Sequence, residues 1–151
     1  MAVHDSEETI YRWGTRRQTM PAISGVHHLA LTVCNLDVSI PWYESIFGLS
    51  KVMDEPHEGG HAVVLMDPHS GLFIGLHAHN ANTGAAFLET ATGLDHVSFS
   101  VAGRAALESW QEHLAVHGVH QAPITDAPYG SVLVFRDPDN IQLELFAAPG
   151  T

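Results

Sequence analysis

Histidine is the residue type in this sequence with the clearest chemical potential. The chain has 151 residues and contains 12 histidines, and imidazole is the commonest metal ligand in proteins. Two of them, His28 and His96, lie in short apolar segments that resemble each other, and Glu144 interrupts a third apolar segment. Cys34 is the only cysteine, so neither an intramolecular disulfide nor a thiolate zinc site can form within the chain. These residue types favour metal chemistry through imidazole.

The two histidine segments belong to an internal repeat, and this places them at equivalent points of two similar units. Four landmarks recur in the same order, at offsets of 68 positions for the first two and 70 for the others: residues 24–33 with 92–101, Trp42 with Trp110, Gly48 with Gly118, and residues 67–68 with 137–138. Repetition of this kind indicates a duplicated structural unit. A single strand histidine is more often a hydrogen-bonded core residue than a ligand, but two at equivalent points make the metal interpretation the stronger one.

Each unit begins with an apolar segment typical of a β-strand, followed by a helix. Strand side chains alternate between faces, so His28 shares a face with Ala30 and Thr32, while His27 points the other way. The second helix is expected from about residue 104 to 117, ended by a glycine. In the first helix we expect Asp37 as the N-cap, Pro41 in the first turn and Gly48 at the end.

Two or three strands complete each unit. Apolar runs at 62–66 and 72–76 flank one Asp-Pro turn, and runs at 131–135 and 141–146 flank the other. A shorter strand around 51–53, with a counterpart near His120, would complete a β-α-β-β-β unit. The sequence therefore predicts an α+β fold of two tandem βαβββ modules, residues 22–80 and 91–148, joined by a linker at 81–90. A polar leader, residues 1–21, precedes them.

Composition excludes several classes of function. Lys and Arg total 6 against 17 for Asp and Glu, which gives a net charge of −11. A chain this acidic is repelled by nucleic-acid phosphates and by anionic membranes. Residues 1–19 lack the apolar core of a signal peptide, and no apolar run reaches the length of a membrane span. We therefore expect a cytoplasmic protein that acts on a small molecule.

Three groups of residues carry a family resemblance. They are the two strands 26–31 and 94–99 with their histidines, the helix that contains Trp-Tyr and ends Phe47-Gly48-Leu49, and Asp137-Pro138-Asp139 followed by Glu144. Over about residues 22–148 the chain resembles the vicinal oxygen chelate superfamily, which includes glyoxalase I, extradiol dioxygenases, fosfomycin-resistance transferases, methylmalonyl-CoA epimerase and bleomycin-binding proteins. The resemblance implies a curved mixed sheet around a metal.

The resemblance also implies a ligand set of His28, His96 and Glu144. The matching position in the first module is Gly75, or Ile74 without a gap, and neither side chain binds metal. Two histidines and one carboxylate with open positions are typical of non-haem Fe²⁺ oxygen chemistry, which makes Fe²⁺ the favoured ion, with Mn²⁺, Zn²⁺, Ni²⁺ or Co²⁺ as alternatives. Two adjacent oxygens of a substrate would chelate such an ion.

Further residues have two interpretations each. His77 matches the position of an acid–base histidine in extradiol dioxygenases, and an exposed strand-end histidine is the alternative. Tyr129 and Arg136 are substrate contacts or surface residues. The tyrosine that those dioxygenases carry ahead of the metal glutamate has no counterpart at 133–135, which argues against catechol cleavage.

The resemblance leaves the reaction open among several functions. The favoured one is a metal-dependent enzyme, dioxygenase-like or a lyase or isomerase, acting on a small oxygenated or aromatic molecule. The alternative is a metal-free drug-binding or natural-product-binding protein of the bleomycin-resistance type. A thiol transferase ranks last because basic residues are scarce. A homodimer is expected, with the metal site either within one chain or across two.

Overall fold

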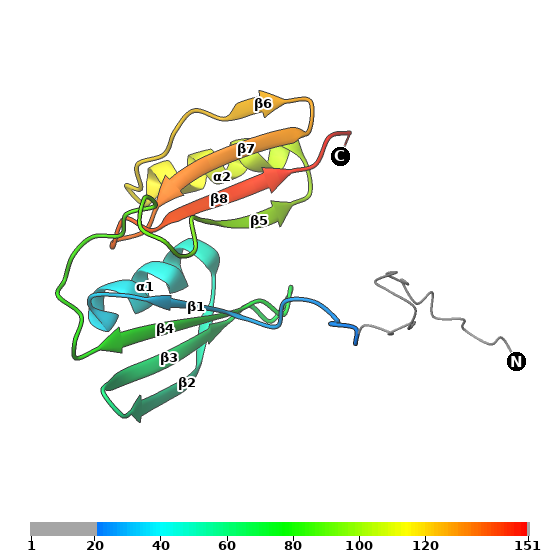
Figure 1. Cartoon of the computed structure of the whole chain (residues 1–151). Helices are drawn as coiled ribbons and strands as arrows, with labels where there is room; N and C mark the ends of the chain where they lie inside the picture. The colour runs from blue at the N-terminus through cyan, green and yellow to red at the C-terminus, as the bar shows by residue number, and fades with distance from the viewer. Residues whose placement is uncertain (1–20, 151) are drawn as a thin grey trace, which may run out of the picture.

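Two four-stranded sheets, each with one helix, make up the computed structural model, which describes residues 21–150 (Figure 1). The first module contains β1 (Leu29–Thr32), α1 (Leu36–Phe47), β2 (Ser50–His57), β3 (Gly60–Met66) and β4 (Phe73–His79). The second contains β5 (Val97–Val101), α2 (Arg104–Val116), β6 (Thr125–Ala127), β7 (Gly130–Arg136) and β8 (Gln142–Ala147). The predicted pair of βαβββ modules is therefore confirmed. The predicted leader, 1–21, lies outside the described residues except for its last position.

Both sheets have the same mixed topology. The strand orders are β1-β4-β3-β2 and β5-β8-β7-β6. In each module the first strand runs parallel to the last, and the remaining pairs are antiparallel. The helix connects the first strand, at one edge of the sheet, to the second strand, at the other edge. The second, third and fourth strands then form an antiparallel meander that ends beside the first strand. The first and last strands of each module are therefore neighbours.

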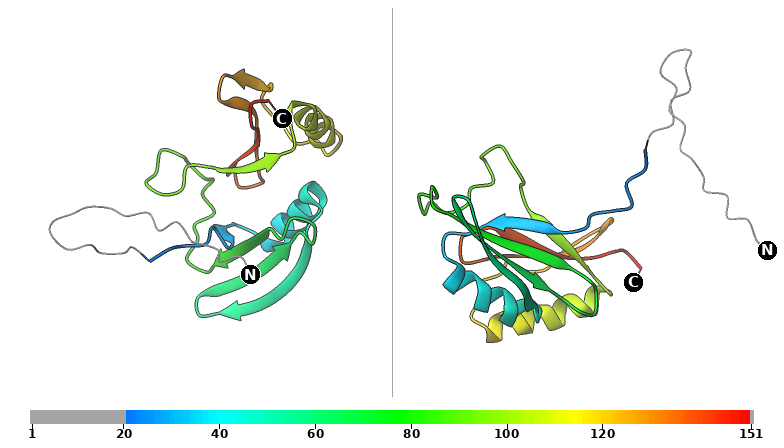
Figure 2. Two further views of the ribbon diagram at one scale, coloured as in Figure 1. Left: turned by 90° about the vertical axis from the view of Figure 1, so that its right-hand side faces the viewer. Right: turned by 90° about the horizontal axis from the view of Figure 1, so that it is seen from below.

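Alternation gives each sheet a buried face and an open face. On the buried face of the first sheet, Leu31, Leu65 and Ile74 are almost completely shielded from solvent. The residues that alternate with them along the strands, such as Thr32 in β1 and His77 in β4, point to the open face. Figure 2 shows α1 and α2 together on one side of the molecule, with the strands of both modules on the other. The helices therefore cover the buried faces and leave both open faces accessible.

The two modules are held together through α1. Tyr43 is fully buried, and its hydroxyl donates a hydrogen bond of 2.9 Å to the buried carboxylate of Asp137 in the other module. Phe47 packs against Trp110, with ring centroids 5.8 Å apart, and Trp42 packs against Phe135. The two tryptophans are partly buried against the core, and each also contacts the opposite module.

The first helix starts differently from the prediction, but it ends at the predicted residue. Asn35 is the N-cap, and its side chain accepts a hydrogen bond from the backbone N–H of Asp37, which we had expected to be the cap itself. Because the helix begins at Leu36, Pro41 lies beyond the first turn, where its missing N–H leaves one carbonyl without a helical partner. Gly48 ends the helix in the left-handed conformation, with φ of 67°.

The second strand of each module also differs from the sequence-based expectation. β2 is longer than residues 51–53, since it continues through Pro56 at the sheet edge, where a missing N–H is tolerated. Its counterpart is not at His120. The chain makes only an isolated bridge at Gln121, and β6 starts after Pro123, a residue without an N–H to donate to a neighbouring strand. No helix within residues 21–150 is long and apolar enough to cross a bilayer.

Candidate functional site

His96 and Glu144 meet on the open face of the second sheet. β5 and β8 are parallel neighbours, and their register pairs Ser98 with Glu144. The alternate residues Val97 and Leu143 point the other way and are buried in the core. His96 Nε2 consequently lies 3.5 Å from Glu144 Oε2, and the Glu144 side chain is only 16% exposed. The strand pairing thus brings together two of the three predicted ligands.

A second partner fixes each of these side chains. His96 Nδ1 donates a hydrogen bond of 2.6 Å to the carboxylate of Asp95, and this bond is the main cause that raises the pKa of His96. Glu144 Oε1 accepts a hydrogen bond of 3.0 Å from the Gln142 side-chain amide. Gln142 in turn accepts one of 3.0 Å from Arg136. Such partners orient metal ligands and select the histidine tautomer.

The donor atoms of this pair fit a divalent cation. Because Nδ1 of His96 carries the hydrogen that Asp95 accepts, Nε2 is the nitrogen that faces a Glu144 carboxylate oxygen, and a cation would take the place of the proton that the raised pKa favours on Nε2. Two ligands about 2.1 Å from one ion at tetrahedral or octahedral angles lie roughly 3.0–3.4 Å apart. The observed 3.5 Å between Nε2 and Oε2 is close to this separation. An ion between these atoms would satisfy both.

His28 is not joined to this pair within the chain. It is exposed, just before β1, and its Nδ1 lies 3.0 Å from Nδ1 of His27. Both His28 and His96 line one surface cavity of about 510 Å³. Within residues 21–150, however, no three histidine, cysteine or acidic side chains are gathered closely enough to hold an ion. The structure of one chain therefore assembles two of the predicted ligands and leaves the third apart.

His77 lies on the open face of the first sheet, over Gly75. Its Nε2 is 3.3 Å from the point where a side chain at position 75 would begin. The position that lacks a metal-binding side chain is therefore partly filled by the imidazole two residues further along the strand. Burial lowers the pKa of His77, and the neighbouring rings of His57 and His79 lower it further. The ring is consequently neutral near pH 7 and able to accept a proton.

The other residues with two interpretations take different places. Arg136 forms an ion pair of 2.9 Å with Glu89 and also donates a hydrogen bond to Gln142. It therefore helps to position Gln142, the partner of Glu144. Tyr129 is 71% exposed in the turn before β7. Asp95 and Gln142 were missed as supporting residues by the reasoning from sequence. Only the adjacency of Asp95 to His96 signalled such a role.

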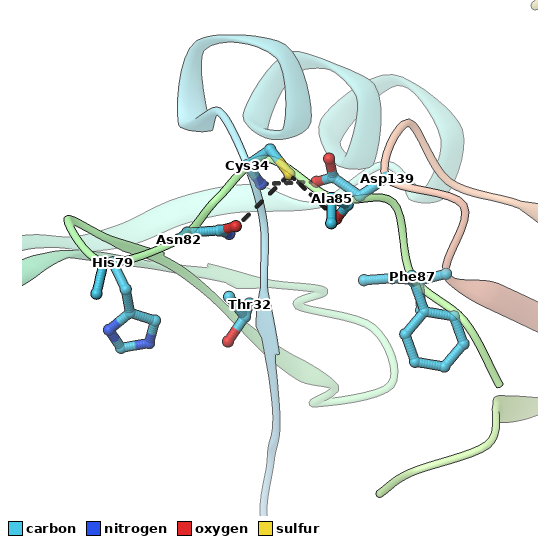
Figure 3. A pocket seen from close by; sticks show the side chains of 9 residues that line it. Thr32, Cys34, His79, Asn82, Ala85, Phe87 and Asp139 are labelled. Carbon is cyan, nitrogen blue, oxygen red and sulfur yellow. Dashed lines mark hydrogen bonds between the residues drawn. The ribbon is translucent and has the colours of Figure 1, made fainter. Parts of the chain in front are cut away.

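A second cavity, of about 410 Å³, lies where the linker passes between the modules (Figure 3). Small and apolar side chains dominate its wall, with Thr32, His79 and Phe87 around it. Cys34 is anchored at its rim, because its backbone N–H donates a hydrogen bond of 2.9 Å to Asp139. Asp139 also raises the pKa of the Cys34 thiol, through a hydrogen bond and its negative charge. This thiol is a poor nucleophile at neutral pH.

Comparison with known proteins gives a consistent assignment. Residues 25–145 match the model of the glyoxalase/bleomycin resistance protein/dioxygenase superfamily. A solved structure of a glyoxylase/bleomycin resistance protein/dioxygenase domain from Frankia sp. EAN1pec is 37% identical, with a TM-score of 0.79 over 84% of this chain and 99% of that one.

Two more distant relatives have more specific names. The putative ring-cleaving dioxygenase MhqA of Bacillus subtilis (strain 168) is 27% identical over 122 residues, 80% of this chain. The match covers 39% of MhqA, so this chain spans about two fifths of that relative's length. The fosfomycin resistance protein FosX of Listeria monocytogenes, solved with Mn(II) and sulfate, is 20% identical, with a TM-score of 0.63 over 85% of this chain and 96% of that one. That likeness shows the fold alone.

Proposed function

Because the chain belongs to the glyoxalase/bleomycin resistance protein/dioxygenase superfamily, we propose that it is a divalent-metal-dependent enzyme acting on a small oxygenated or aromatic molecule. The observation that carries this proposal is the pair of His96 and Glu144, whose donor atoms are 3.5 Å apart on an open sheet face. A bound divalent cation would supply Lewis-acid chemistry to two adjacent substrate oxygens. His28 is the proposed third ligand.

The supporting residues prepare this site for a cation. Asp95 holds the tautomer of His96 that leaves Nε2 available, and Gln142 fixes one oxygen of Glu144 so that the other faces the histidine. With two neutral imidazoles and one carboxylate, a dication would retain positive charge toward the substrate. Fe²⁺ is the favoured ion because this ligand set is typical of non-haem iron oxygen chemistry. MhqA, a putative ring-cleaving dioxygenase by name, favours the same reaction class.

His77 is the proposed acid–base residue. Its lowered pKa keeps the imidazole neutral, so it can accept a proton from a substrate hydroxyl and return it later. The ring lies on an open sheet face, next to the space left by Gly75. A lyase or isomerase would use such a base as readily as a dioxygenase. An experiment is therefore needed to distinguish a dioxygenase from a lyase or isomerase.

Metal content measured by mass spectrometry is the first test. The protein is loaded anaerobically with Fe²⁺, and separately with Mn²⁺, then desalted. We expect about one bound ion per chain, retained in His69→Ala, an exposed turn histidine, and lost in His96→Ala and Glu144→Ala. Oxygen uptake by the Fe²⁺ form with dihydroxylated aromatic compounds identifies a dioxygenase. Metal binding without oxygen uptake supports a lyase or isomerase instead, and no metal binding overturns the enzyme proposal.

The origin of the third ligand is tested by mixing two inactive variants. We propose a homodimer in which His28 of one chain completes the His96–Glu144 pair of the other, because one chain alone leaves His28 apart from that pair. His28→Ala and Glu144→Ala are unfolded together and refolded in equal amounts. Half of the dimers are then mixed, each with one intact site, so about a quarter of the wild-type metal content returns. A site within one chain returns none.

The metal-free binding protein is kept as the second candidate because of the cavity between the modules. Its volume of about 410 Å³ and its wall of small and apolar residues suit an apolar ligand. Equilibrium dialysis against a panel of small aromatic natural products, in the presence of a chelator, tests this function. Binding that persists without metal supports it, and the absence of binding excludes it for those compounds.

A further inference from the structure

Three histidines form a cluster on the open face of the first sheet, separate from His96 and Glu144. The strand register places His57, Gly60 and His79 in one row across β2, β3 and β4, with His77 two positions away on β4. The ring centroids are 5.4 Å apart for His57 and His79, 5.8 Å for His57 and His77, and 6.1 Å for His77 and His79. Each ring therefore neighbours the other two.

The cluster depends on a glycine in the middle strand. β2 and β4 are not adjacent, so a side chain from β2 reaches β4 only by crossing β3. At Gly60 the His57 ring occupies the space that a side chain would need, with Cε1 2.8 Å from the ideal Cβ position. The missing side chain of Gly60 thus lets His57 lie across the strand toward His77 and His79.

One ring nitrogen of His57 has no hydrogen-bond partner. Its Nδ1 lies 2.9 Å from the carbonyl oxygen of Glu58, which can only accept, so Nδ1 carries the hydrogen. Nε2 therefore holds a lone pair, and it is buried with no hydrogen-bond partner among the described residues. An unsatisfied buried acceptor is costly unless something else occupies it. A histidine with one nitrogen donating to a carbonyl and the other free is oriented like a metal ligand.

We propose that His57, His77 and His79 form a second metal site, suited to a tetrahedral ion such as Zn²⁺ with one position left for water. Three imidazoles on a tetrahedral ion, with Zn–N near 2.0–2.1 Å, have ring centroids about 5 Å apart, close to the spacing in the cluster. The donor nitrogens do not yet converge on one point. Rotation of the side chains, easiest for the exposed His79, brings them together.

The electrostatic setting favours a cation. The chain has a net charge of −11, which attracts cations to its surface. Occupation of the cluster would engage His77, the proposed acid–base residue. Excess Zn²⁺ is therefore expected to inhibit the enzyme, a consequence that rests on the function proposed above, whereas the binding itself does not.

Titration calorimetry with Zn²⁺ tests the site in the full chain. The double variant His96→Ala, Glu144→Ala removes the first site, and we expect it to retain about one Zn²⁺ per chain. Adding His57→Ala is expected to weaken that binding more than about tenfold, whereas adding His61→Ala, on the opposite face of the same hairpin, leaves it unchanged. Co²⁺ in the double variant should give the visible absorption of a tetrahedral site. Unchanged Zn²⁺ affinity on adding His57→Ala, or no Zn²⁺ binding by the double variant, overturns the second site.

The reciprocal variant separates this proposal from the first. His57→Ala alone should keep the ion held by His96 and Glu144 and should lose the inhibition by excess Zn²⁺. If the double variant binds Zn²⁺ and His57→Ala binds no ion, the second site stands and the first fails. If His57→Ala still binds one ion and the double variant binds none, the reverse holds.

Discussion

Replacement of Asp95 by Asn tests whether His96 is a ligand whose partner tunes the metal site. The substitution keeps an oxygen that can accept from His96 Nδ1, so the tautomer and ring position are preserved, while the negative charge is lost. Second partners of metal-bound histidines are typically worth about 10- to 100-fold in metal affinity. The Asp95 side chain is 63% exposed and that of His96 39%. Solvent screens an exposed pair, so we expect the lower end, about a tenfold loss, or ~1.4 kcal/mol.

The assay is competition for Mn²⁺ or Co²⁺ between the protein and a chelator of known affinity, at pH 7.5. Asp126→Asn is the matched control, because it removes the same charge from another exposed ion-paired carboxylate of the second module. We expect this control to bind as the wild type does. Wild-type affinity in Asp95→Asn, or an equal loss in Asp126→Asn, would contradict this prediction. It would mean that the hydrogen bond of 2.6 Å does not act on a metal ligand.

Three further predictions concern stability and protonation. Tyr43→Phe removes one donor from the buried carboxylate of Asp137 and should lower the free energy of unfolding by about 2 kcal/mol, measured by urea denaturation, whereas the exposed Tyr129→Phe should have no effect. Gly48→Ala should cost about 1 kcal/mol in the same assay; the left-handed φ of 67° alone is responsible, since an added Cβ meets no atom within 4 Å, and an unchanged midpoint would contradict this. His77 should titrate below an ordinary histidine in NMR spectra. Because the unfolded chain then binds a proton that His77 does not bind in the folded state, the contribution of His77 makes the protein less stable as the pH falls through the ordinary histidine range, and it vanishes above that range. A midpoint at or above the ordinary value would be inconsistent with the partly buried ring.

Local patterns in the sequence were sufficient to predict most of the fold. The repeat predicted two equivalent modules, and the Asp-Pro turns located the hairpins that end them. The glycine at position 48 ended its helix as predicted. The errors occurred where several residues compete for one role. Asn35 and Asp37 are both good caps, and only the packing of the helix decides between them. Near His120 the chain makes only an isolated bridge at Gln121, and the strand that corresponds to β2 is Thr125–Ala127.

Alternation along the strands determined, from sequence alone, that the side chains of His96 and Glu144 leave the core on the open face of their sheet. It did not determine which residues meet there. His96 and Glu144 come together because β5 and β8, distant in the chain, pair in parallel, whereas β1 beside His28 pairs with β4 in the other sheet. The position of the His57 ring over Gly60 likewise depends on the pairing of their two strands. Sequence periodicity fixes the face of a strand, because it is a local property of the backbone. The neighbour of a strand is chosen by the burial of the whole core, and that choice exists only in the tertiary structure.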